Sequence, residues 1–231
     1  NTYFLIHHAN TLQSLTIIFR HIRSPTSSIR SYAVHTQSVR DLHMKQALTL
    51  TDTQYRNVIN FCTTRKHTLR DQTIIHVSFL AGLRAVELAA LTVGDVYDDR
   101  GAVRSQFTLS STQTKGAYTR TVYISTKLKR VLKQYRTVLN TRTSTQPLFM
   151  TQMHTSFSAN TMCQLFLQIY KDFGLRGASS HSGRRTFITK LANTGINVRL
   201  LAALAGHRHI STTQRYIDVN DEQLANAVEL L

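Results

Sequence analysis

The stretch from 181 to 216 constrains this chain most, because it gathers cationic side chains around a single phenol. Its sequence is HSGRRTFITKLANTGINVRLLAALAGHRHISTTQRY. The arginines, histidines and tyrosine considered as site residues are His181, Arg184, Arg185, His207, Arg208, His209, Arg215 and Tyr216. Its apolar spacing predicts two helical hairpins. His181 and Arg184 stand at i and i+3, so both project from one helix face and can grip one small anion together.

A helix-loop-helix is predicted between the arginines and the tyrosine. Gly195 is expected to end one helix and Gly206 the next, because glycine readily adopts the left-handed conformation at a helix C-terminus. The buried stripe of the second helix is expected to consist of Leu200, Leu201 and Leu204. His207 then lies at a helix end and projects toward the anion site. Ser211 is expected to cap a short helix that presents Tyr216.

The chemistry of this stretch depends on whether its cationic side chains favour ionisation of the phenol. A free phenol ionises near pH ~10, so it is a poor nucleophile at neutral pH unless neighbouring cations favour the phenolate. Two arginines and two histidines provide such surroundings and would also neutralise a pentacoordinate phosphorane. Each motif alone is common in unrelated proteins, so the interpretation depends on their combined order.

That order resembles the carboxy-terminal signature of the tyrosine recombinases, the phage-integrase family. It consists of H-x-x-R at 181–184, L-x-G-H at 204–207, and a tyrosine nine residues after His207. In that family the tyrosine attacks a DNA phosphodiester and becomes linked to the 3′ phosphate. A metal site at His181, His207 and His209 is the weaker alternative, because no carboxylate or thiolate joins these histidines and arginines repel cations. We therefore expect neither a metal nor another cofactor.

Residues 81–91, AGLRAVELAAL, form the second informative stretch. Gly82 is expected to end a helix, which leaves Arg84 on a rigid turn suited to oriented recognition of a phosphate. The apolar side chains expected inside the next helix are Val86, Leu88 and Leu91. The stretch matches the first arginine box of the tyrosine recombinases, G-L-R-x-x-E-L-x-x-L. Glu87 is interpreted as a buttress for the arginines, and a surface salt bridge to Glu87 or Asp95 is the alternative role of Arg84.

A small antiparallel sheet is predicted within 96–124, where VRSQFTL and YTRTVYI alternate around a turn through 110–116. Lys115 lies at this turn. It matches the hairpin lysine that, in the family, protonates the 5′ oxygen as general acid, with Lys127 as the alternative. An ammonium suits that role because it approaches the oxygen as a mobile point charge.

The resemblance implies a mainly helical α+β catalytic domain with a small antiparallel β-sheet over 47–231. Residues 1–46 are expected to be an N-terminal remnant or linker, in part disordered. Because the chain begins at Asn1 rather than Met, we expect a truncated chain that lacks an N-terminal DNA-clamping domain. Further helices are predicted at 53–66 (capped by Asp52), 69–80, 126–140, 158–173 and 221–231. Cys62 and Cys163 are interpreted as reduced core residues of a cytosolic protein.

The net charge of the chain indicates what kind of partner it binds. The net charge of +16 is spread along the sequence, as expected of a folded surface that follows a polyanion. The sequence has no long apolar span, so we expect double-stranded DNA rather than a membrane as partner, in the cytoplasm or nucleoid. Backbone contacts to DNA are expected from Arg185, Arg208, Arg215 and Arg120.

The resemblance implies a site-specific recombinase or integrase with the active-site set Arg84, Lys115, His181, Arg184, His207 and Tyr216. It also implies a homo-oligomer, a tetramer on two DNA sites, in which the last helix docks in cis or on a neighbour. The reaction needs no ATP, because the phosphotyrosine bond conserves the energy of the broken phosphodiester. A type IB topoisomerase and a catalytically silent DNA-binding fragment of a mobile element are the alternatives.

Overall fold

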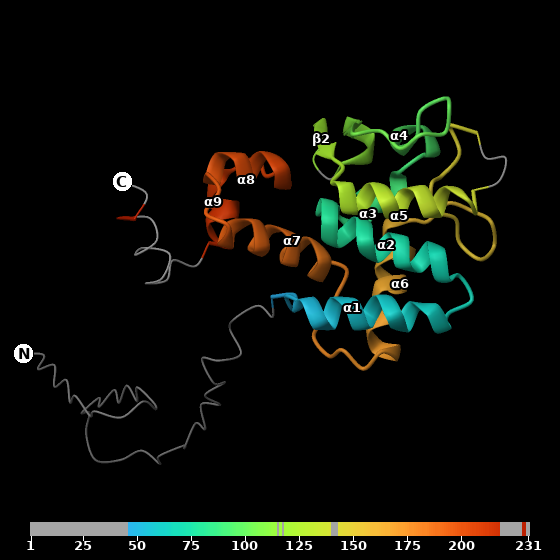
Figure 1. The fold of residues 1–231 in the computed structure, drawn as a ribbon, viewed down its shortest axis with the longest axis horizontal. Helices are drawn as coiled ribbons and strands as arrows, with labels where there is room; N and C mark the ends of the chain where they lie inside the picture. The colour runs from blue at the N-terminus through green and yellow to red at the C-terminus, as the bar shows by residue number, and fades with distance from the viewer. Residues whose placement is uncertain (1–45, 115, 117, 140–142, 218–227, 230–231) are drawn as a thin grey trace, which may run out of the picture. The chain divides into compact units, whose positions relative to one another are not determined.

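The computed structural model describes residues 46–114, 116, 118–139, 143–217 and 228–229, all in one compact unit that spans 45–231 (Figure 1). The expectations for 1–45, for Lys115 and for most of 221–231 lie outside these residues. The described part is mainly helical with a two-stranded antiparallel sheet, which confirms the predicted α+β class. None of its helices is both long and apolar enough to cross a membrane.

The described helices follow the predicted ranges closely. They are α1 (Asp52–Phe61), η2 (Cys62–Thr64), α2 (Thr68–Ala81), α3 (Ala85–Ala90), α4 (Val93–Val96), η3 (Ser111–Gln113), α5 (Thr126–Arg136), α6 (Ala159–Asp172), α7 (Ser182–Asn193), α8 (Val198–Ala205) and α9 (Ile210–Gln214). The strands are β1 (Gln106–Leu109) and β2 (Arg120–Tyr123). The helices expected at 53–66, 69–80 and 158–173 are confirmed to within a few residues, whereas the one at 126–140 ends earlier, at Arg136.

Side-chain caps fix where two of these helices begin. Thr51 is the N-cap of α1, since its Oγ1 accepts from the Gln54 amide at 3.2 Å and its own amide donates to Gln54 Oε1 at 2.9 Å. The prediction that Asp52 caps this helix is wrong by one residue, because Asp52 already has helical backbone and its carboxylate instead pairs with Lys190 of α7. Ser158 caps α6 in the same manner.

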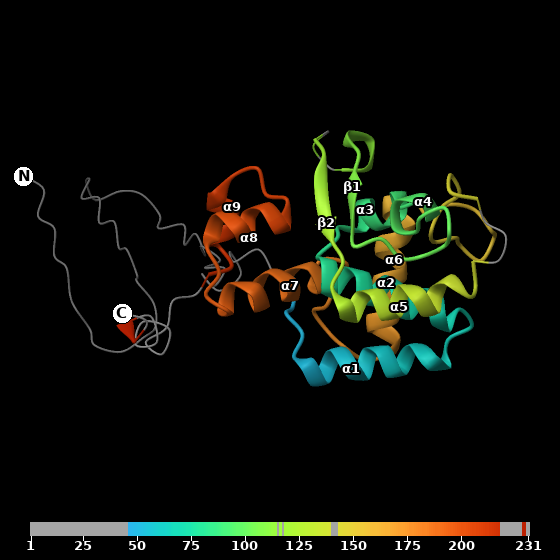
Figure 2. The ribbon, with the colours of Figure 1, turned by 45° about the horizontal axis from the view of Figure 1, so that its top comes forward.

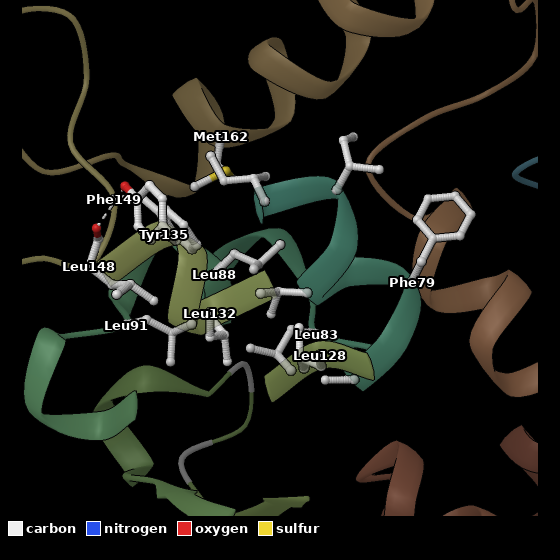
Figure 3. Close-up of a cluster of buried hydrophobic side chains, with 14 of the residues drawn as sticks. Phe79, Leu83, Leu88, Leu91, Leu128, Leu132, Tyr135, Leu148, Phe149 and Met162 are labelled. Carbon is white, nitrogen blue, oxygen red and sulfur yellow. Dashed lines mark hydrogen bonds between the residues drawn. The ribbon is translucent and has the colours of Figure 1, made fainter. Parts of the chain in front are cut away.

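The main hydrophobic core lies among α1, α2, α3, α5 and α6. Figure 3 shows its centre, where side chains of α3, α5 and the 148–149 segment meet. Among the fully buried leucines are Leu83, Leu88, Leu91, Leu128 and Leu132, each about 2 kcal/mol more favourable inside than in water. Of the three side chains expected inside the helix after Arg84, Leu88 and Leu91 are buried, and Val86 is partly exposed.

The sheet is a single hairpin whose register is fixed by alternation. Leu109 pairs with Arg120 and Phe107 with Val122, and all four side chains are buried. Arg120 therefore points inward from a strand whose other buried side chain, Val122, is apolar. This confirms the predicted hairpin and places a cation on the covered face of β2.

A second, smaller hydrophobic cluster holds α7, α8 and α9 together. Its buried members are Ile188, Ala192, Leu201 and Ala205, with Tyr216 and Ile217 packed against them. In Figures 1 and 2 these helices lie to one side of the main core, where α7 contacts α2 and α8 contacts β2.

Two predictions about these helices are wrong. Leu200 is 53% exposed, because the short α8 turns a single face to α7 and that face carries the neighbouring Leu201. Ser211 is not a cap, because α9 starts one residue earlier, at Ile210, and His209 is its N-cap without a side-chain hydrogen bond.

Candidate active site

Arg84 is held at the turn between α2 and α3. Gly82 ends α2 with φ +63°, a left-handed conformation that glycine adopts without steric cost, and Arg84 follows as the N-cap of α3. The backbone amide and the side-chain Nη1 of Arg84 donate to the two carboxylate oxygens of Glu87, both at 2.8 Å. Because Glu87 is fully buried, this is an internal pair and not the alternative surface salt bridge. Asp95 instead caps α4 with Thr92.

Arg184 links the two hydrophobic clusters. It projects from α7 with only 4% of its surface exposed, and its Nη1 donates to the Gly82 carbonyl at 2.7 Å. Its Nη2 donates to the Ala205 carbonyl at 2.5 Å. Burial, together with the charges of Arg84 and Arg120, lowers the pKa of Arg184 to about 9, so the guanidinium is still protonated at neutral pH.

Arg120 completes a cluster of three arginines, two of which pair with Glu87. Its Nη2 forms an ion pair with Glu87 Oε2 at 3.3 Å, and its Nη1 donates to the Leu204 carbonyl at 3.2 Å. The Arg120 side chain is only 4% exposed. Among the ion pairs of the described residues, Glu87 is the single carboxylate that contacts Arg84 and Arg120, and Arg184 makes none with it.

The C-terminal end of α8 is the surface on which the cluster assembles. Arg120 donates to the Leu204 carbonyl and Arg184 to the Ala205 carbonyl. The Gly206 carbonyl accepts from Arg84 at 3.4 Å and from Tyr118 Oη at 2.8 Å. Unpaired carbonyls and the negative end of the helix dipole both attract cations at this position. Gly206, with φ +63°, ends the helix as predicted.

His207 follows directly and is half-buried against the arginines. Its Nδ1 shares a hydrogen bond of 2.9 Å with Thr213 Oγ1 of α9. Burial and the charges of Arg184, Arg84 and Arg120 lower the pKa of His207 from 6.5 to about 4, so the imidazole is neutral at neutral pH. A neutral imidazole bound at Nδ1 retains its other ring nitrogen for a ligand.

Tyr216 lies between His207 and Arg185, just after α9. Its ring stacks on His207 with 5.9 Å between centroids, and the Arg185 guanidinium lies 5.4 Å from its centre. The charge of Tyr216 also acts on Arg184. The phenol is thus partly buried between an imidazole and a guanidinium.

The remaining predicted residues are more dispersed. His181 is exposed at the N-cap of α7, where its amide donates to Ser179 Oγ at 3.3 Å. Arg208, His209 and Arg215 are exposed around α9. Lys115 lies outside the described residues, and its alternative, Lys127, stands over the ring of Tyr55 at 5.4 Å. Within the described ranges, no three His, Cys, Asp or Glu side chains are grouped as metal ligands would be.

Sequence reasoning overlooked Tyr118 and took Arg120 for a surface residue. The signal was available in the strand alternation, because Tyr118, Arg120 and Val122 are two residues apart and therefore share the covered face of the strand. A buried arginine on such a face requires an internal partner, which Glu87 supplies.

Comparison with solved structures identifies the fold. The chain superposes on the crystal structure of XerA recombinase with a TM-score of 0.64 and 24% identity, over 79% of this chain and 64% of that one. It matches the Tn1549 transposon integrase, solved in complex with a circular intermediate DNA, with a TM-score of 0.65 and 20% identity, over 80% and 66%. The fold is that of tyrosine recombinase catalytic domains.

Sequence comparison then gives the family. The model of the phage integrase family matches residues 49–223, so the chain belongs to this family. Similar proteins include tyrosine recombinase XerC of Pelobacter propionicus, 27% identical over 68% of this chain and 50% of that protein. Tyrosine recombinase XerA of Pyrococcus furiosus is 29% identical over 71% of this chain and 55% of that protein. The chain thus spans about half the length of these curated relatives.

Proposed function

We propose that this chain cleaves and rejoins DNA strands in site-specific recombination or integration, through a covalent 3′-phosphotyrosine intermediate. One observation carries the proposal: Arg84, Arg120 and Arg184, of which the first two pair with the buried Glu87, meet at the end of α8, beside Tyr216 and a neutral His207. Family membership supports the same reaction class.

The charge balance of the cluster suits a phosphate. Arg84, Arg120 and Arg184 carry three positive charges against the single charge of Glu87, so two remain uncompensated in a site of low solvent access. An unbalanced charge of this kind is costly unless an anion binds. The extra negative charge that a phosphorane gains under attack would be neutralised by a site that is already oriented. Arg84, which is 22% exposed, and Arg184 are proposed to bind the non-bridging oxygens.

The proposed step exchanges one phosphorus–oxygen bond for another. The Tyr216 oxygen forms a bond to phosphorus while the bond from phosphorus to the 5′ oxygen breaks, and His181 accepts or relays the phenolic proton. His207 donates a hydrogen bond to a non-bridging oxygen. Lys115 is proposed to protonate the 5′ oxygen that leaves. Attack by another strand's 5′ hydroxyl on the phosphotyrosine reverses these changes, so neither ATP nor a metal is required.

The proposed substrate is double-stranded DNA, bound by a tetramer on two sites. The net charge of +16 supports a polyanionic partner. Arg185, Arg208 and Arg215 are proposed as backbone contacts, and the last two are exposed beside the site.

The test is covalent trapping. The protein and its Tyr216→Phe variant are incubated with nicked suicide duplexes, drawn from a pool with randomised cores, and resolved on denaturing gels. A protein-DNA band from the parent alone, undiminished by EDTA, is the expected result. DNA binding without a band would contradict the proposal, and relaxation of supercoiled plasmid without a defined site pair would indicate a topoisomerase instead.

A further inference from the structure

Arg120 is placed where an ordinary DNA contact would not be. Its side chain is 4% exposed, on the covered face of a strand, opposite the fully buried Leu109. A contact to the DNA backbone outside the active site would present its guanidinium at the protein surface. This side chain is instead directed into the protein, toward Glu87 and the end of α8.

The partners of Arg120 lie on both sides of the site. Through Glu87 it shares a carboxylate with Arg84, which stands on the main core. Through the Leu204 carbonyl it holds the end of α8, which carries His207 and belongs to the second hydrophobic cluster. Arg120 thus fixes the separation between the arginine box and the segment that leads to Tyr216.

The chain is shaped to admit this side chain. A Cβ at Gly206 would lie 2.5 Å from Arg120 Cδ, closer than two carbon atoms can approach without displacement. Glycine at 206 therefore permits the left-handed end of α8 and also leaves space for Arg120. Tyr118, on the same face of the hairpin, donates to the Gly206 carbonyl at 2.8 Å and strengthens the attachment.

We infer that Arg120 is a positioning residue that locks the β-hairpin to Glu87 and to the end of α8, rather than a contact to DNA. This inference rests on the proposed function, since the groups it positions are those proposed to act on the phosphate.

A guanidinium is required here because it reaches two acceptors at once. Its planar fork holds two terminal nitrogens apart, so Nη1 donates to the Leu204 carbonyl while Nη2 forms an ion pair with Glu87. A lysine in its place would keep the charge but reach only one of these partners well. Arg120→Lys therefore separates charge from geometry.

The first experiment compares binding with chemistry. Arg120→Gln, Arg120→Lys and the matched control Arg100→Gln, which removes the same charge from an exposed turn, are measured in the full chain. DNA affinity is read by fluorescence anisotropy across a salt series, and adduct formation by single-turnover trapping at saturating nicked duplex. A positioning role lowers the rate at saturation, whereas a phosphate contact changes the affinity and the salt slope.

We expect Arg120→Gln to form adduct roughly 10- to 100-fold more slowly, with affinity within about threefold of the parent and an unchanged salt slope. Arg120→Lys should recover part of the rate, and Arg100→Gln should match the parent. A parent-like rate with weaker binding and a shallower salt slope would show that Arg120 contacts phosphate. Parent-like behaviour of Arg120→Lys in every measurement would refute the need for the fork, even if Arg120→Gln fails to fold.

A second readout does not depend on activity. NMR with labelled histidine, assigned with His207→Gln, follows the imidazole of His207 during a pH titration. Because the Arg120 charge contributes to the low pKa of His207, Arg120→Gln should raise that pKa and Arg100→Gln should not. If the parent forms no adduct, the proposed function fails while this titration still decides the place of Arg120. An unchanged His207 pKa in Arg120→Gln would overturn the inference.

Discussion

Replacing Glu87 by Gln tests whether one carboxylate holds the arginine cluster together. Glu87 is fully buried, accepts from the Arg84 amide and guanidinium at 2.8 Å each, and lies 3.3 Å from Arg120. Removing one partner of a buried ion pair costs about 3 to 5 kcal/mol, because the remaining charge is left uncompensated. Since glutamine keeps the shape and one carbonyl acceptor, we expect the lower end, about 3 kcal/mol of unfolding free energy.

The assay is urea denaturation followed by circular dichroism, with Asp172→Asn as the matched control. Asp172 accepts from Arg65 at 3.0 Å but is 36% exposed, so its loss should cost less than about 1 kcal/mol. A loss below about 1 kcal/mol for Glu87→Gln as well would show that Glu87 does not offset repulsion among the arginines. That result would remove the charge argument for the site.

Three other predictions concern the end of α8, two buried histidines and the leucines of α8. Gly206→Ala should cost about 2 to 4 kcal/mol in denaturant unfolding, from left-handed strain plus the clash with Arg120, whereas Gly195→Ala, with φ +74° in open space, should cost about 1 kcal/mol. Burial is the main reason why the pKa values of His207 and His76 are lowered to about 4 in the folded protein. Between pH 6.5 and 4 the unfolded chain therefore binds more protons than the folded one, so folding stability is lost as the pH falls through this range. Urea melts at pH 7 and 5 should differ by about 1 to 2 kcal/mol per histidine, and by less in His207→Gln. Leu201→Ala should cost about 2 to 5 kcal/mol and Leu200→Ala less than about 1, as thermal melts would show.

The sequence predicted the fold well where a local rule decides the structure. Gly82 and Gly206 end their helices in the left-handed conformation, as expected of glycine after an apolar run. The hairpin followed from alternation, and α6 from its amphipathic pattern. These features depend on neighbours within about four residues, so they can be read from the sequence.

What the sequence could not supply depends on distant partners. Leu200 and Leu201 differ by one helical step, and only the position of α7 determines which of them is covered. Arg120 resembles any other strand arginine until Glu87, 33 positions earlier, and the end of α8 come to lie beside it. Motif order predicted Arg84, Arg184, His207 and Tyr216 as site residues, yet it gave no indication of how their side chains are held together.

The way in which these residues are held has a consequence for how the site can be assembled. Arg84 and Glu87 stand on the main hydrophobic core, whereas His207 and Tyr216 stand on the smaller cluster of α7–α9. Between them run hydrogen bonds from Arg84, Arg120, Arg184 and Tyr118 to carbonyls at the end of α8. Polar contacts of this kind are sensitive to small displacements, because they depend on both distance and angle. The groups proposed for catalysis are therefore correctly placed only while these hydrogen bonds to the end of α8 are formed. Substitutions of Glu87, Arg120 and Gly206 should consequently lower the reaction rate more than the DNA affinity.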